Sequence, residues 1–134
     1  MADWDDVRRF ALALPETAER ESRGNAQWRV KEKLFVWERP LRKPDLEALG
    51  QKAPEGAVLG AMVADLGEKE ALLLERPEVF FTTPHFNGYA AVLVRLERIS
   101  EELLGQVVIE AWLARAPARL AGEYLAAHPP HAGP

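Results

Sequence analysis

Apolar side chains recur at every third or fourth position near both ends of the chain, and this spacing predicts amphipathic helices. The first helix is expected after Asp3, whose carboxylate can cap it, and before Pro15, because proline disfavours the α conformation in the preceding residue. Ser100 and Pro117 mark the expected starts of a long helix and of a last helix. The predicted apolar stripes are Trp4, Val7, Phe10, Ala11 and Leu14, then Leu103, Leu104, Val107, Val108, Ala111 and Trp112, and finally Leu120, Ala121, Tyr124 and Leu125.

The middle of the chain carries short runs of β-branched and aromatic side chains, which are typical of strands. The predicted elements are a hairpin over 27–39 that turns at Lys31-Glu32, a strand over 57–65, a short helix over 68–75, and strands over 79–82 and 89–96. Polar connections are expected at 16–26, with a turn at Gly24-Asn25, and at 41–52, with a helical turn at 45–49.

This order, α-β-β-β-α-β-β-α-α, separates the strands from most of the helices. Such an order predicts the α+β class, in which an antiparallel sheet and a layer of helices on one of its faces form two layers. No internal repeat or linker interrupts the pattern, so residues 1–128 are expected to form a single domain. The Pro- and Gly-rich residues 129–134 are expected to be a flexible tail.

Composition narrows the function classes. At 134 residues with 48% hydrophobic side chains, the chain can bury a core without a disulfide or a metal. The absence of cysteine excludes disulfides, thiolate zinc sites, iron–sulfur clusters and cysteine nucleophiles. No apolar run approaches the roughly 18 residues of a membrane helix, and the acidic start lacks the features of a signal peptide. We therefore expect a cytoplasmic protein without membrane association.

Charge is distributed unevenly along the chain. The formal net charge is −4, which disfavours non-specific binding of polyanions over the whole surface. Residues 20–43 nevertheless carry eight basic and three acidic side chains, whereas residues 44–78 carry eight acidic and three basic ones. The positive charge is thus concentrated in one segment, and contacts in the fold decide how much of it is free.

The basic segment supplies the first candidate site. Arg29, Lys31 and Lys33 alternate, so an extended backbone would project them from the same side and lay them along a phosphate backbone. The residues predicted to bind nucleic acid are Arg29, Lys31, Lys33, Arg39, Arg42 and Lys43. The alternative is a solubilising hairpin whose charges protect a sheet edge, and the negative net charge favours it.

The second candidate is a ligand site formed by the loop residues His85, Asn87 and Tyr89 together with Trp37. A loop histidine beside hydroxyl and amide groups could act as a general base or bind an anion. No acidic residue is close in sequence to orient it, so we favour the alternative that His85 packs against Phe86 and Trp37. No nucleophile–base pair, metal-ligand cluster or phosphate loop is present in the sequence, and we expect neither catalysis nor a metal or cofactor.

Each tryptophan can be interpreted either as a binding residue or as a core residue. An aromatic cluster could stack on bases, but tryptophan at strand and helix-face positions more often belongs to the core. Trp4 and Trp112 fit apolar stripes and are predicted to be core residues, while Trp28 could serve either purpose.

Several local motifs occur together in a definite order. They are Leu14-Pro15, Trp28-Arg29-Val30, the run from Lys33 to Trp37, Phe80-Phe81 with the run from Thr83 to Gly88, and the helix from Ser100 to Trp112. In these motifs the chain resembles the MmcQ/YjbR family of small bacterial proteins over residues 1–115, although Tyr89 to Val92 stand where the family commonly has a tryptophan. The resemblance implies a two-layer α+β fold of the secretion-chaperone type and DNA binding.

Three functional hypotheses follow. The first is a non-enzymatic binding protein that contacts DNA weakly through the basic hairpin. The second is a protein-interaction module that docks a partner protein or a second copy of itself through its sheet face or edge. The third is an enzyme or small-ligand carrier with a pocket around His85, Tyr89 and Trp37. The salt dependence of binding distinguishes the first two hypotheses, because added salt weakens phosphate contacts but not apolar docking.

Overall fold

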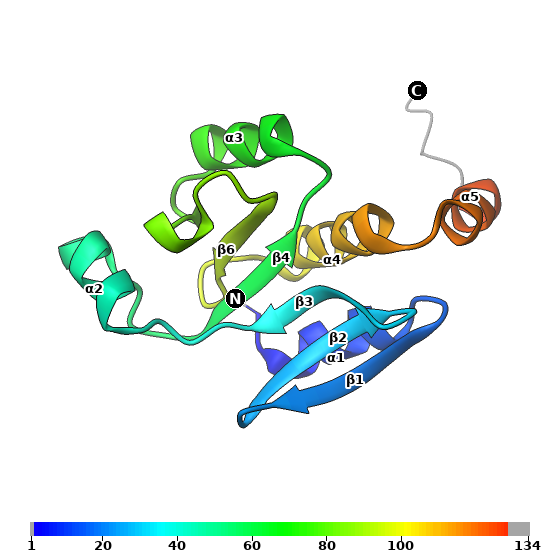
Figure 1. Cartoon of the computed structure of the whole chain (residues 1–134), viewed down its shortest axis with the longest axis horizontal. Helices are drawn as coiled ribbons and strands as arrows, with labels where there is room; N and C mark the ends of the chain where they lie inside the picture. Colours follow the sequence, from blue (N-terminus) through cyan, green and yellow to red (C-terminus); the bar gives the residue numbers. More distant parts are fainter. Residues whose placement is uncertain (1, 129–134) are drawn as a thin grey trace.

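The computed structural model describes residues 2–128, which form a six-stranded antiparallel sheet with the order β1-β2-β3-β4-β6-β5 and helices packed against it (Figure 1). The strands are β1 (Thr17–Ser22), β2 (Asn25–Val30), β3 (Lys33–Glu38), β4 (Val58–Met62), β5 (Phe80–Phe81) and β6 (Ala91–Arg95). The helices are α1 (Trp4–Leu12), α2 (Lys43–Leu49), α3 (Leu66–Glu75), α4 (Glu101–Arg115) and α5 (Ala118–Ala127), with the 3₁₀ turns η1 (Gly50–Lys52) and η2 (Pro84–Phe86). The predicted α+β class is confirmed, and the expected tail 129–134 lies outside the described residues.

The helix starts follow the capping chemistry predicted from the sequence. Asp3 Oδ1 accepts a hydrogen bond from Asp6 N at 3.0 Å, and Asp6 Oδ2 accepts one from Asp3 N at 3.0 Å, so the two residues form a reciprocal cap for α1. Ser100 Oγ accepts from Leu103 N at 3.1 Å at the start of α4, and α5 begins after Pro117.

The prediction that residues 16–26 are a polar connection is wrong, because Thr17–Ser22 forms β1 at the edge of the sheet. The strand pairs with β2 residue for residue, from Thr17 opposite Val30 to Ser22 opposite Asn25. Its outer edge has no neighbouring strand, and most of its side chains are exposed. An edge strand of this kind needs no apolar alternation, so residues 17–22 show no alternating strand pattern.

The predicted hairpin turn between β2 and β3 is confirmed. Lys31 and Glu32 have φ angles of +49° and +68°, the left-handed conformation that a two-residue hairpin turn requires at both positions. Farther along the hairpin, the pairing shifts by one residue between Trp28 and Arg29. This bulge lets both Leu34 and Trp37 line the same cavity, although they are three positions apart.

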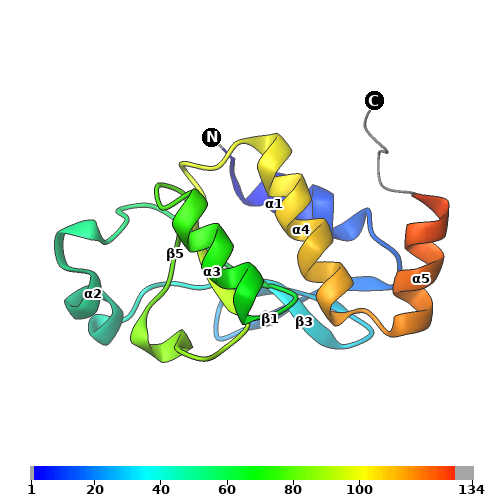
Figure 2. The same ribbon diagram turned by 90° about the horizontal axis from the view of Figure 1, so that it is seen from above.

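The core lies between the sheet and the helices α1 and α4, which Figure 2 shows side by side. Trp28 is only 1% exposed and stacks on Trp4 of α1 with ring centroids 6.4 Å apart, so Trp28 is a core residue. Helix α4 approaches α1 closely at Gly105, where an added Cβ would lie 3.3 Å from the ring of Phe10. Trp112 is also buried, and its Nε1 donates to Pro15 O at 3.1 Å.

The opposite face of the sheet carries the elements that build the site. Gln27 pairs with Trp37, whereas Trp28 pairs with Val36, so Gln27 and Trp37 point away from α1. Helix α2 and the loop around η2 lie against each other near this face. None of the helices within residues 2–128 has both the length and the apolar character that crossing a bilayer requires.

Candidate functional site

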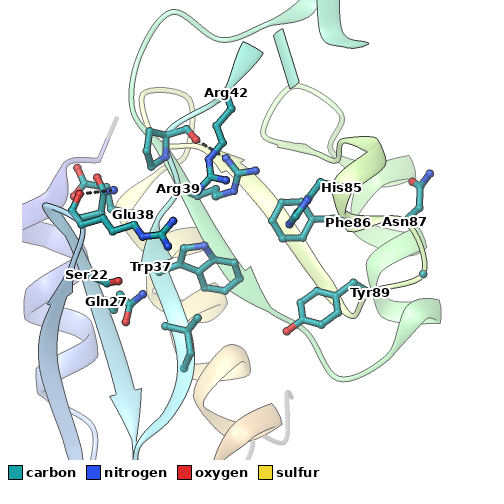
Figure 3. A pocket seen from close by; sticks show the side chains of 15 residues that line it. Ser22, Gln27, Trp37, Glu38, Arg39, Arg42, His85, Phe86, Asn87 and Tyr89 are labelled. Atoms are coloured by element: carbon teal, nitrogen blue, oxygen red, sulfur yellow. Dashed lines mark hydrogen bonds between the residues drawn. The ribbon is translucent and has the colours of Figure 1, made fainter. Parts of the chain in front are cut away.

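A cavity of about 610 Å³ opens on the face of the sheet away from α1 (Figure 3). One wall comes from the β2–β3 hairpin and contributes Gln27, Leu34 and Trp37. The other wall is the loop after β5, with His85, Phe86 and Tyr89. Arginines from the β1–β2 turn and from the segment after β3 also line the cavity, at Arg23, Arg39 and Arg42.

The hairpin wall depends on a glycine in the neighbouring strand. Gly60 of β4 lies opposite Trp37, and a Cβ at position 60 would be only 2.3 Å from Trp37 Cε2. The indole therefore lies directly on the β4 backbone, a close approach that only glycine allows. Trp37 is 9% exposed, so the ring is fixed by this packing rather than free to rotate.

Aromatic contacts join the two walls. The Phe86 ring lies 6.4 Å from the Trp37 ring and 6.2 Å from the Tyr89 ring, and both pairs are tilted. Phe86 is buried, whereas Tyr89 is 50% exposed and offers its ring to solvent. The predicted Asn87-Gly88 turn is confirmed, with a φ of +74° at Gly88, and it reverses the chain between Phe86 and Tyr89.

A buried lysine holds the loop wall in place. Lys69 of α3 is 6% exposed, and its Nζ donates to the backbone oxygens of Phe86 at 2.6 Å and Tyr89 at 2.8 Å. No acidic partner lies within 4.0 Å of Nζ among the residues that the structure describes. Burial lowers the pKa of Lys69, because the ammonium has lost much of its hydration. The sequence hid this residue, since Glu68 and Glu70 on either side make the segment look like a solvated face.

Arg39 is held by a buried ion pair. Its Nη2 lies 3.1 Å from Oδ2 of Asp45 in α2, and the guanidinium stacks 5.3 Å from the centre of the Phe86 ring. Burial by itself would raise the pKa of Asp45, but the hydrogen bond from the Arg42 backbone N–H and the charge of Arg39 outweigh it, so the pKa of Asp45 lies below its ordinary value. This ion pair fixes α2 against the cavity and balances the charge of Arg39.

The remaining two arginines of the cavity carry its free positive charge. Neither Arg23 nor Arg42 has an acidic side chain within 4.0 Å in the described part of the chain. Glu38 is the one acidic side chain among the lining residues, and its Oε1 already accepts a hydrogen bond from Ala26 N at 3.0 Å. With Arg39 balanced by Asp45, the two charges of Arg23 and Arg42 outweigh that of Glu38, so the cavity is positive on balance and lined with aromatic rings.

The prediction that Arg29, Lys31 and Lys33 project from one side is wrong. Lys31 lies in the turn, Lys33 pairs with Val30, and Arg29 pairs with Leu34, so Arg29 and Lys33 face opposite sides of the hairpin. The basic side chains near the turn also form ion pairs: Lys31 lies 3.8 Å from Glu16, and Arg20 lies 3.0 Å from Glu32. Arg29 donates to Gln27 Oε1 at 2.9 Å and to Glu32 O at 2.9 Å.

The structure thus brings together two sets of residues that the sequence kept apart. From the predicted nucleic-acid set it places Arg39 and Arg42 in the cavity, and from the predicted ligand site it places Trp37, His85, Asn87 and Tyr89 there. Arg29, Lys31, Lys33 and Lys43 do not line it. Arg23 was not predicted, because its position in the cavity depends on the β1–β2 turn, which the sequence did not show to be part of a sheet.

His85 makes the contact with Phe86 that we favoured. The two rings meet edge to face with centroids 4.9 Å apart, and no carboxylate within residues 2–128 pairs with the imidazole. Without an orienting acid, His85 lacks the arrangement expected of a general base. The described residues also contain no cluster of three or more His, Asp or Glu side chains arranged to hold a metal ion.

The chain is similar to a family of known proteins in sequence and to a solved structure in fold. A family model described as YjbR matches residues 12–114. Uncharacterized protein Rv2570 of Mycobacterium tuberculosis H37Rv and uncharacterized protein Mb2600 of Mycobacterium bovis are each 50% identical to the chain over 129 residues, covering 94% of this chain and 98% of the relative. The crystal structure of Deinococcus radiodurans protein DR2400, a DUF419 domain, matches with a TM-score of 0.62 over 84% of this chain and 78% of that chain. At 20% identity, this likeness shows the fold alone.

Proposed function

The chain belongs to the YjbR family, and from this premise we propose that it is a non-enzymatic binding protein whose ligand is DNA. The contact that we propose is not the hairpin tip, where basic side chains have acidic neighbours. It is the rim of the cavity, where Arg23 and Arg42 stand beside Arg39.

The observation that carries this proposal is the pair of arginines without acidic partners among the described residues, Arg23 and Arg42, on one concave site. Guanidinium groups match phosphate geometry and form charge-assisted hydrogen bonds with it. The charges of Arg23 and Arg42 are free to meet a ligand, because the nearby carboxylate of Asp45 is paired with Arg39 instead. The net charge of −4 opposes a polyanion elsewhere on the surface, so we expect binding to be weak and confined to this site.

Two phosphate contacts set the size of the expected salt effect. The logarithm of the binding constant falls by about 0.7 per contact for single strands and about 0.9 for duplexes with each unit of log salt. Two contacts therefore predict a loss of roughly sevenfold to twelvefold in affinity between 50 and 200 mM salt. Removing one of the two arginines should lower the slope by about 0.7 to 0.9.

The experiment is a titration of fluorescent DNA with the protein at several salt concentrations. Arg23→Ala and Arg42→Ala should each weaken binding and reduce the salt slope. Arg98→Ala is the matched control, because Arg98 is exposed and lies outside the cavity, and it removes the same charge. Equal losses in all three variants would show that only the overall charge matters, and unchanged binding in both cavity variants would contradict the proposal.

Docking of a protein is the second candidate, because the same cavity combines the apolar side chains of Leu34 and Trp37 with the exposed ring of Tyr89. Apolar contacts gain little from low salt, so binding of a protein here would be nearly independent of salt. A salt slope near zero for a bound partner, with no DNA binding even at low salt, would favour this candidate over the first.

A further inference from the structure

The aromatic side chains of the two walls face each other across the cavity and define a slot between them. Trp37 on β3 lies across the cavity from Phe86 and Tyr89 on the loop (Figure 3). Trp37 and Phe86 are buried, whereas the half-exposed Tyr89 offers ring surface to a ligand. A volume of about 610 Å³ is within the range of sites that enclose one small organic group.

The hairpin wall adds a hydrogen-bond donor to this slot. Gln27 Oε1 accepts bonds from Arg29 Nε at 3.3 Å and Nη2 at 2.9 Å. A guanidinium has only donors, so these bonds fix the amide orientation and identify the other terminal atom as nitrogen. That Nε2 has no acceptor among the described residues. Arg29 therefore orients Gln27 from outside the cavity, so that the amide can donate to a ligand inside it.

We infer that the slot takes the unpaired base of a nucleotide, so that single-stranded DNA rather than duplex DNA is the ligand. This inference rests on the proposed function and adds to it the form of DNA that is bound. A base has the planar shape that stacks on Tyr89, and it carries acceptors for the Gln27 amide. Its phosphates would then lie at the rim beside Arg23 and Arg42. Bases inside a duplex are stacked and paired and cannot enter a recessed site without being extruded.

The first experiment compares three fluorescein-labelled probes at one low salt concentration. They are a 12-nucleotide thymidine strand, a sugar–phosphate strand of the same length without bases, and a 12-base-pair duplex. We expect the thymidine strand to bind roughly tenfold more tightly than the strand without bases, since stacking of one base typically contributes that much. It should also bind more tightly than the duplex.

The outcomes separate this inference from the proposed function. Equal affinities for the thymidine strand and for the strand without bases would overturn the inference and leave phosphate contact intact. No binding of any probe would overturn both. A thymidine monophosphate that binds as tightly as the strand would also overturn the inference, because the ligand would then be a free nucleotide.

Variants at the slot give a second test that does not depend on the stability of the core. Tyr89→Ala removes the exposed ring and should lower the affinity for the thymidine strand to that of the strand without bases. Tyr89→Phe should keep the preference, because a phenyl ring still stacks. Leu74→Ala is the control, since Leu74 is 74% exposed and lies outside the cavity. A preference for bases that persists in Tyr89→Ala would refute the assignment of this slot.

Discussion

Replacing Gly60 by alanine tests whether the position of Trp37 builds the cavity. An added Cβ would lie 2.3, 2.5 and 2.8 Å from Trp37 Cε2, Cζ2 and Cδ2. Carbon atoms at their optimal separation are about 3.5–4.0 Å apart. The indole must therefore move away from β4 by roughly 1 Å or more. Since Trp37 is packed against Phe86, that movement disturbs both walls of the cavity.

The expected change in the free energy of unfolding follows from two opposing effects. Overpacking a well-packed site typically costs about 1–3 kcal/mol. Alanine also reduces the conformational freedom of the unfolded chain relative to glycine, which offsets about 0.4–1 kcal/mol. We expect Gly60→Ala to lower the free energy of unfolding by about 1–2 kcal/mol. For a domain of this size that corresponds to a fall in Tm of roughly 3–10 °C.

The assay is urea unfolding and thermal melting, with Gly122→Ala as the control. Gly122 lies inside α5 with nothing within 4 Å of its Cβ position, so alanine there should be neutral or stabilise by up to about 1 kcal/mol. Repeating Gly60→Ala in a Trp37→Leu background isolates the clash with the ring. A cost that is the same in both backgrounds, or no cost at all, would refute the argument that the indole lies on the Gly60 backbone.

Two further predictions concern buried charges. Asp45→Asn should destabilise the protein by roughly 3 kcal/mol, because Arg39 stays buried without its counterion. Folding lowers the pKa of Asp45, so its contribution to stability is full above the ordinary value of 3.8 and is lost as the pH falls through the lower native value. The free energy of unfolding should therefore depend less on pH in the acid range in the variant than in the wild type. Lys69→Met should cost about 1–3 kcal/mol through the unpaired loop carbonyls and should speed amide exchange at Gly88 and Tyr89. Because burial lowers the pKa of Lys69, wild-type stability should rise as the pH approaches the ordinary value of 10.5, and a similar rise in the methionine variant, measured by urea unfolding, would contradict this account.

The features that the sequence predicted well are local in origin. The caps at Asp3 and Ser100 and the turns at Lys31-Glu32 and Asn87-Gly88 depend on neighbouring residues, and each is found where expected. Local chemistry of this kind is fully present in a short stretch of sequence. The predicted order of elements lacks β1, but it separates the strands from most of the helices, and the α+β class predicted from it is confirmed.

The parts that the sequence missed depend on contacts between distant segments. β1 is a strand because β2 lies beside it, not because its own residues alternate. Lys69 is buried because the loop 17 residues later folds over it, although its neighbours Glu68 and Glu70 are exposed. The turn at Lys31-Glu32 likewise sets Lys33 opposite Val30 rather than Arg29, and this register overturned the expected grouping of Arg29 with Lys33. Charge patterns along a strand therefore predict a surface only once the register is known.

The edges of the sheet bear on whether a second copy of the chain could extend it. A two-fold antiparallel pairing of β1 with itself places residues of the same face opposite each other. Centred on Glu19 or on Glu21, it sets that glutamate against its own copy, and centred on Arg20 it sets Arg20 against Arg20 and Glu19 against Glu21. Like charges directly opposite destabilise such a pairing. The other edge, β5, has only two residues, Phe80–Phe81, and offers little backbone to pair. Since the longest pairings of β1 with itself oppose like charges and β5 is short, the face that carries the cavity is the better place to look for a binding partner.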